Sequence, residues 1–88
     1  MDSTDKRKLR AKAHSLKPVV MIGQSGLTPA VLTEIESALA AHELIKIKIR
    51  AERELRKQIG LQICLDTKAE LIQTIGQITI IYRHNPDK

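Results

Sequence analysis

VVMIGQSGLTP, at residues 19–29, passes from an apolar run through two glycines to the start of a helix. Adjacent β-branched residues after Pro18 predict a short strand over 19–22. Thr28 is a typical N-cap residue, and Pro29 is a typical first residue of a helix. The stretch therefore predicts a strand, a tight turn and a helix that begins at Pro29.

The turn in this stretch has the sequence Gly23-Gln24-Ser25-Gly26. Two glycines three positions apart let the backbone bend and let another molecule approach it closely. The first N–H groups of the following helix lack partners within the helix, and together with the helix dipole they favour an anion. A G-x-x-G turn is by itself a weak signal, because many such turns only reverse the chain.

The hydrophobic pattern on either side of this stretch predicts an α/β domain in the order α-β-α-β-α-β-β. The β-α-β unit implies parallel strands with a right-handed crossover, whereas the final strand pair must be antiparallel. We expect one mixed four-stranded sheet packed with helices, a core over about 4–84 and a loose tail over 84–88. The predicted helices are 4–15, 29–42 and 52–66, and the predicted strands are 19–22, 44–50, 69–75 and 78–83.

The first strand and the first helix have specific expected features. Because the apolar residues of 19–22 do not alternate with polar ones, this strand is expected inside the sheet with both faces buried. Ser3 or Thr4 is the expected N-cap of the first helix. An apolar stripe on that helix is expected to face the core, and it consists of Leu9, Ala13 and Leu16.

The third helix and the last hairpin also follow from local signals. Leu55, Ile59 and Ile63 recur at helical spacing and form the expected core face. Gly60 lies inside this helix, where it is less favourable than Ala by about 1 kcal/mol. Gly76 begins a two-residue connection between the last strands, which predicts a type II′ turn.

The strand over 44–50 shows strict alternation, with isoleucine at every second position and the cations Lys46, Lys48 and Arg50 between them. Burying each isoleucine stabilises the fold by roughly 1.5–3 kcal/mol, so the core side sets the register and the cations share the other face. These cations either protect an edge strand from further pairing or form a cationic surface for a ligand. Both interpretations remain open.

The charge of the chain is unevenly distributed. Fifteen Lys and Arg against ten Asp and Glu give a net charge of +5. Six cations lie in 6–17 and six in 46–57, while 18–45 contains none. Two basic segments suggest a polyanionic partner, although solvated helix and strand faces explain the same blocks.

Composition excludes several classes of protein. Because the chain has one Tyr and neither Phe nor Trp, its core must be aliphatic, and it lacks the aromatic platform of an RRM. Its one cysteine, Cys64, rules out an internal disulfide and is expected to be a small core residue. No segment is suited to a membrane span or a signal peptide, so we expect a soluble, cytoplasmic protein.

No catalytic or metal-binding set is recognisable. His14, His42 and His84 are scattered, and Cys64 has no candidate base beside it in sequence. The glycine turn lacks the Lys-Ser/Thr pair of a P-loop and is too short for a dinucleotide fingerprint. We therefore expect no enzyme, no cofactor, no metal site and no small-molecule substrate.

Three motifs resemble one known family, and they are LKPVVMIGQSGL at 16–27, AAHELIK at 40–46, and QTIG at 73–76 followed by IYR at 81–83. Together they resemble the CRM domain, named for chloroplast RNA splicing and ribosome maturation, in its stand-alone bacterial YhbY-like form. The resemblance covers about 4–84. It implies a fold similar to the C-terminal domain of bacterial translation initiation factor three, and association with ribosomal RNA of large-subunit precursors.

The resemblance also implies which residues contact RNA. Gly23, Gln24, Ser25 and Gly26 match the RNA-contacting loop of the family, but Gln24 and Ser25 carry no charge. The loop is therefore expected to hold a phosphate by its backbone, while cations elsewhere attract the RNA. The expected cations are Lys6, Arg7, Arg10, Lys17, Lys46, Lys48 and Arg50. We expect a monomer, and the alternative function is a protein-interaction module whose basic faces meet acidic partners.

Overall fold

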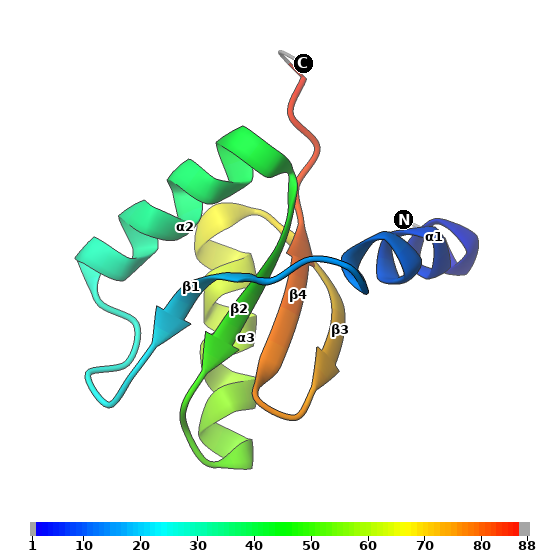
Figure 1. The fold of residues 1–88 in the computed structure, drawn as a ribbon. Coiled ribbons are helices and arrows are strands. Elements are labelled where there is room, and N and C mark those ends of the chain that lie inside the picture. Colours follow the sequence, from blue (N-terminus) through cyan, green and yellow to red (C-terminus); the bar gives the residue numbers. More distant parts are fainter. Residues whose placement is uncertain (1, 87–88) are drawn as a thin grey trace.

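A mixed four-stranded sheet with helices on both faces forms the fold (Figure 1). The computed structural model describes residues 2–86. The predicted α/β class and the order of elements are confirmed. The elements are α1 (Ser3–Ala13), β1 (Pro18–Ile22), α2 (Pro29–His42), β2 (Leu44–Ile49), α3 (Arg53–Thr67), β3 (Glu70–Ile75) and β4 (Ile78–Tyr82).

β1 lies at an edge of the sheet, where the sequence predicted an interior strand. The strands are ordered β1-β2-β4-β3, with β1 parallel to β2 and the other pairs antiparallel. Val20 and Ile22 are buried, whereas Val19 and Met21 are 50% and 55% exposed. The prediction that both faces are buried is wrong, because helices cover only one face of this edge strand.

β2 is a central strand, with β1 on one side and β4 on the other. Ile45, Ile47 and Ile49 are almost fully buried on the face that carries α2 and α3. Lys46 and Lys48 point to the opposite face, as their alternation predicts. Because β2 has a partner along each edge, the interpretation of its lysines as edge protection is wrong.

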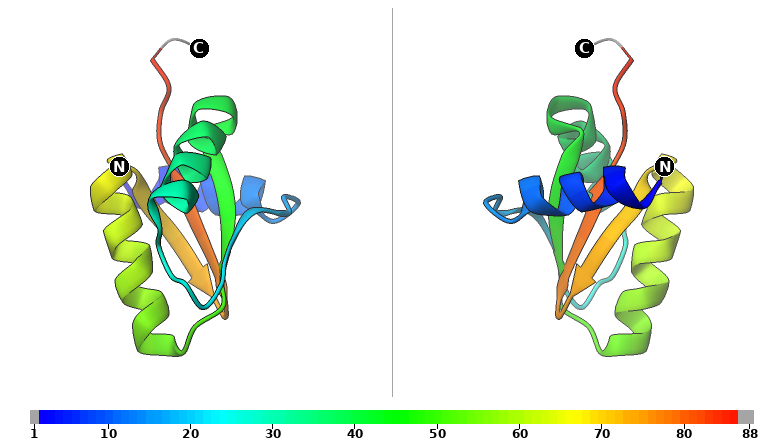
Figure 2. Two further views of the ribbon diagram at one scale, coloured as in Figure 1. Left: turned by 90° about the vertical axis from the view of Figure 1, so that its left-hand side faces the viewer. Right: turned by 90° about the vertical axis from the view of Figure 1, so that its right-hand side faces the viewer.

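The main core lies between the sheet and the two helices α2 and α3, which pack on the same face (Figure 2). Every buried side chain in it is aliphatic, as the composition requires. This aliphatic burial supplies most of the favourable folding energy of a domain of this kind. The core consists of Val20, Ile22, Ile35, Leu39, Ile45, Ile47, Ile49, Ile59, Ile63 and Ile81.

α1 crosses the opposite face of the sheet and contacts β2 and β3 (Figures 1 and 2). Ala13 is buried there in a second, smaller cluster with Leu44, Ile72 and Ile80. The helix ends at Ala13, so Leu16 lies beyond it and is 38% exposed, outside the predicted stripe. This single short helix leaves much of the β1 side of the face open.

Asp2 caps α1 in place of the predicted Ser3 or Thr4. Its carboxylate accepts a hydrogen bond from the backbone N–H of Asp5 at 2.9 Å. A charged cap oxygen gains from the positive end of the helix dipole as well as from the hydrogen bond. The helix therefore starts at Ser3, one residue earlier than predicted.

α3 runs without interruption through Gly60, but its first turn differs from the prediction. Ile59 and Ile63 are buried, whereas Leu55 is 46% exposed and does not belong to the core. Leu55 belongs to the first turn of α3, and this turn extends past the ends of the strands (Figure 1). Cys64 is half-buried at the border of the core.

The β3–β4 turn agrees with the prediction, whereas the segment after β4 does not. At the β3–β4 turn, Gly76 has a φ of +55° and Gln77 has no positive φ, as a type II′ turn requires. The segment 84–86 is not loose, because Asn85 donates its side-chain N–H to the carbonyl of Ala40 at 2.8 Å and its backbone N–H to Glu43. Residues 87 and 88 lie outside the described part of the chain.

Gly60→Ala is expected to raise the free energy of unfolding by about 0.5–1 kcal/mol, because alanine loses less backbone entropy in a helix. A Cβ at this position would lie 3.7 Å from Cγ2 of Thr79, which is an ordinary contact. Urea unfolding followed by circular dichroism measures the change. Gly76→Ala is the control and should destabilise the protein through its positive φ; a less stable Gly60→Ala variant would contradict the expectation.

Candidate nucleic-acid interface

The glycine loop between β1 and α2 is a tight turn closed by its own backbone. The N–H of Gly26 donates to the carbonyl of Gly23 at 3.1 Å. Gly26 has a φ of +71°, whereas Gly23 has no positive φ. Only the second glycine is therefore demanded by the backbone conformation. Gln24 and Ser25 are exposed at the tip, and no described residue accepts their backbone N–H groups.

The backbone N–H groups at the start of α2 are largely capped, as expected from Thr28 as the N-cap residue. The hydroxyl of Thr28 accepts the N–H of Val31 at 3.2 Å, and Pro29 has no N–H. Ala30 is the residue of this first turn whose N–H lacks a partner among residues 2–86. The helix start therefore offers an anion fewer free N–H groups than the sequence suggested, because capping occupies the helix end.

A row of cations on β2 runs alongside β1 towards the glycine loop. Lys46 is paired in register with Pro18, and Lys48 is paired with Met21. Arg50 follows directly after β2, and its backbone N–H donates to the carbonyl of Ile22 at 2.9 Å. This hydrogen bond places Arg50 beside the first residue of the loop. The structure therefore brings the β2 cations and the loop together, although they are far apart in sequence.

Lys46 also has a structural role. Its ammonium Nζ donates to the backbone carbonyl of Leu16 at 2.9 Å, which fastens the connection between α1 and β1 to the sheet. Lys17, the next residue, is exposed at the same place. Lys46 keeps two further N–H groups for a ligand, so it both supports the fold and extends the cationic row. We define the β2 row as Lys17, Lys46, Lys48 and Arg50.

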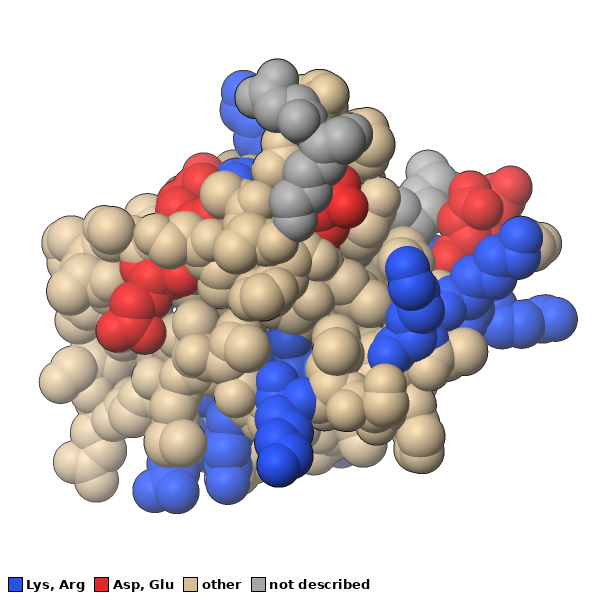
Figure 3. Space-filling model, turned by 45° about the horizontal axis from the view of Figure 1, so that its top comes forward, with Lys and Arg blue, Asp and Glu red and all other residues tan. Residues whose placement is uncertain are grey.

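The cations of α1 lie apart from the glycine loop. α1 crosses the upper part of the face in Figure 1, and the loop lies at the lower end of the sheet. Arg7 is exposed, while Lys6 and Arg10 are partly buried one helical turn apart. Figure 3 shows Lys and Arg side chains along the lower part of the view and over α1 at its right. The β2 row therefore lies between the loop and α1.

Aliphatic side chains border the β2 row on this face. Val19 and Met21 of β1 are about half exposed next to the lysines, and Ile78 of β4, which is partly buried, is paired with Lys48 on the other side. Sugars and bases present apolar surface to a protein as well as polar edges, so such side chains suit a nucleic acid. The sequence did not point to these residues, because their exposure depends on the edge position of β1 and the short span of α1.

Cys64 is half-buried near Glu70. Burial, followed by the nearby carboxylate of Glu70, raises the pKa of the Cys64 thiol, so it is a weak nucleophile at neutral pH. No group of three or more His, Cys, Asp or Glu side chains in the described range is arranged to hold a metal ion. No helix among these residues has the length and apolarity needed to cross a membrane.

Comparisons relate the chain to known proteins. The family model of the CRS1 / YhbY (CRM) domain matches residues 1–83. An RNA-binding protein of Haemophilus influenzae is 49% identical over 84 residues, which cover 94% of this chain and 85% of the relative. A protein of Pseudomonas aeruginosa named a probable RNA-binding protein is 42% identical over 82 residues. These residues cover 92% of this chain and 79% of the relative.

A solved structure has the same fold. The solution structure of a hypothetical protein from Staphylococcus aureus superposes with a TM-score of 0.85 at 30% sequence identity. The match covers 97% of this chain and 90% of that one. The arrangement of three helices on a mixed four-stranded sheet is therefore shared over nearly the whole chain.

Gly26→Ala and Gly23→Ala are expected to differ in stability although both positions face open space. Gly26→Ala should lower the free energy of unfolding by about 1–2 kcal/mol, because an L-residue is strained at its positive φ. Gly23→Ala should change it by less than about 0.5 kcal/mol. Urea unfolding of the two variants measures the difference. Equal losses would show that the loop does not keep this conformation.

Proposed function

The chain belongs to the CRS1/YhbY (CRM) domain family, and on this basis we propose that it is a non-enzymatic RNA-binding protein. Relatives that carry RNA-binding names support the proposal. The observation that carries it is the β2 row, which ends beside the glycine loop. Within residues 2–86 the row forms no ion pair, so its charge remains available to phosphates.

The loop and the row have different tasks in this proposal. The cations attract the RNA and release counterions from its phosphates, which provides affinity without sequence preference. The free backbone N–H groups of Gln24 and Ser25 then hold one phosphate, because no side chain at Gly23 or Gly26 blocks its approach. Attraction and positioning are thus assigned to different residues.

Lys6, Arg7 and Arg10 extend the contact to the other end of the face. Their helix lies beyond the β2 row as seen from the loop, so an RNA that reaches both ends must span the face. A folded RNA with closely spaced phosphates meets this requirement better than a single nucleotide does. α1 therefore adds affinity for structured RNA.

The RNA in this proposal is ribosomal RNA in precursors of the large ribosomal subunit, bound by a monomer in the cytoplasm. Crosslinking the protein to RNA in cells and sequencing the bound fragments tests this assignment. Fragments concentrated in large-subunit ribosomal RNA are expected. Partners that all survive nuclease treatment in a pull-down would instead favour a protein-interaction module.

Affinity for a fragment of large-subunit ribosomal RNA should fall steeply with salt, with a log–log slope of about −3 to −5 for roughly five neutralised phosphates. Lys48→Ala with Arg50→Ala should flatten this slope by up to about two and leave the unfolding midpoint nearly unchanged. Fluorescence anisotropy across a salt series measures both slopes.

The matched control for this experiment is Lys68→Gly. Lys68 is exposed at the C-terminal end of α3 with a φ of +62°, so glycine removes a charge there without strain. Its salt slope should equal that of the unaltered protein. A slope near zero for the unaltered protein, or equal slopes for all three proteins, would contradict binding through the β2 row.

A further inference from the structure

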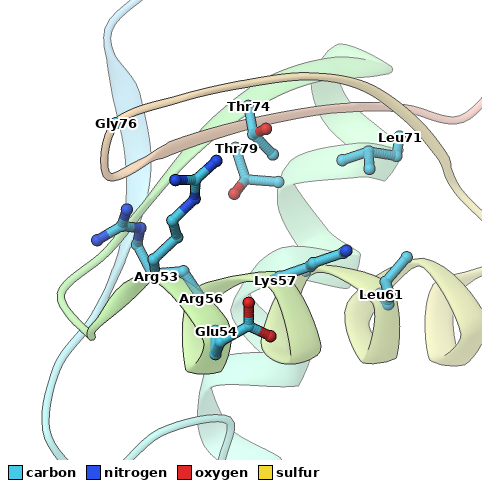
Figure 4. Close-up of a pocket in the computed structure, with 10 residues that line it drawn as sticks. Arg53, Glu54, Arg56, Lys57, Leu61, Leu71, Thr74, Gly76 and Thr79 are labelled. Atoms are coloured by element: carbon cyan, nitrogen blue, oxygen red, sulfur yellow. The ribbon is translucent and has the colours of Figure 1, made fainter.

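A second basic surface lies on the other face of the sheet, in a groove between α3 and the β3–β4 hairpin (Figure 4). The groove has a volume of about 680 Å³. Sites for small ligands occupy about 300–1,000 Å³, so this groove has the size of a site. Neither the β2 row nor the glycine loop contributes to its lining.

One wall of the groove is a stripe of α3. Arg53, Arg56 and Lys57 line it together with residues one turn further along the helix. Their spacing of i, i+3 and i+4 places them on the same side of a helix. Figure 4 shows the two arginine side chains on the side of α3 that faces the hairpin, with Lys57 running along the helix. Glu54 also borders the groove, so three cations face one carboxylate.

The other wall is formed by the hairpin. Thr74 and Thr79 are directly opposite each other in the β3–β4 register, so their side chains project to the same face. Figure 4 shows both threonines above the cations of α3. Neither hydroxyl forms a hydrogen bond with another residue in the described part of the chain, and Thr74 is exposed whereas Thr79 is buried against α3. Leu61 and Leu71 supply apolar surface at one end.

The cations of this groove lie towards the positive end of the α3 dipole. They occupy the first two turns of α3, and the last turn has no basic residue. Cations at the positive end of a helix dipole are unfavourable, so an anion bound beside them would remove a repulsion. No carboxylate in residues 2–86 lies within ion-pair distance of Arg53, Arg56 or Lys57.

Arg56 is held in position before any ligand binds. Its Nη1 donates to the backbone carbonyl of Ala51 at 2.7 Å. This bond uses one of the five N–H groups of the guanidinium and leaves the others for an anion. A side chain that is already ordered loses less entropy on binding, which favours affinity.

The groove and the glycine loop share one end of the molecule. The backbone N–H of Ile49 donates to the carbonyl of Gln77 at 2.8 Å, which joins the end of β2 to the hairpin turn. Arg50 then lies between the loop on one side and Arg53 at the start of α3 on the other. The glycine loop and the hairpin turn both lie at the lower end of the sheet in Figure 1.

We propose that this groove binds one nucleotide of a single-stranded RNA segment, as a second contact of the RNA whose binding is proposed above. The three cations bind its phosphate, and the hydroxyl of the exposed Thr74 bonds to its ribose or base edge. A single strand is required because the bases of a duplex are stacked and cannot enter a groove between two elements. The strand passes Arg50 on its way from the glycine loop.

The test titrates the ¹⁵N-labelled full chain with a short oligouridylate and follows backbone amide shifts by NMR. Amides of Thr74, Gly76 and Thr79 should move together with those of the glycine loop. Affinities come from anisotropy of the labelled oligouridylate across a salt series. Lys57→Ala should flatten the log–log slope by about 0.7, and Arg53→Ala with Lys57→Ala by about 1.4.

Two further variants separate the contribution of the cations to RNA binding from that of the Thr74 hydroxyl. Lys68→Gly removes one charge from the opposite end of α3 and should leave the slope unchanged. Thr74→Val removes a hydroxyl at an exposed strand position and should weaken binding about fivefold with no change in slope. Unfolding midpoints in urea check that each variant is folded.

The outcomes separate this proposal from the proposed function. If the unaltered protein binds neither ribosomal RNA nor oligouridylate, the proposed function fails. If it binds RNA while Lys57→Ala matches Lys68→Gly and the hairpin amides do not move, the groove proposal is overturned and RNA binding stands. Binding of folded ribosomal RNA without any binding of oligouridylate also overturns the groove proposal.

Discussion

The alternation of isoleucine and cations along β2 is the constraint on which the rest of the structure depends. Ile45, Ile47 and Ile49 lie at the centre of the main core, between two neighbouring strands and two helices. A slip of one residue would expose all three and bury Lys46 and Lys48 instead. The positions of the lysines are therefore set by burial on the opposite face, and the cationic row is present whether or not a ligand is bound.

Electrostatics within the protein contributes little to holding this fold together. Among residues 2–86 the one ion pair of Lys or Arg with a carboxylate joins Arg83 to Glu36 at 2.8 Å. The cations of α1, β2 and the start of α3 are grouped with like charges, which opposes folding. An aliphatic core supplies the stability instead. Most of the positive charge therefore has no carboxylate partner among residues 2–86.

Features that depend on residues close together in the sequence were predictable from it. Thr28 and Pro29 define the start of α2, and the alternation over 44–49 defines the two faces of β2. The edge position of β1 was not predictable, because a short apolar run has the same appearance at an edge and in the interior. The groove was missed because Thr74 and Thr79 meet the cations of α3 only through tertiary packing.

The sheet order gives β4 a particular importance for how the chain folds. β4 lies between β2 and β3, and it is the last of the four strands in sequence. While the chain emerges from a ribosome, β2 can pair with β1 but keeps an open edge, and β3 has no partner in the sheet. Closure of the sheet must wait for residues 78–82. Vectorial synthesis thus makes folding a late event, completed by a strand that inserts between two others.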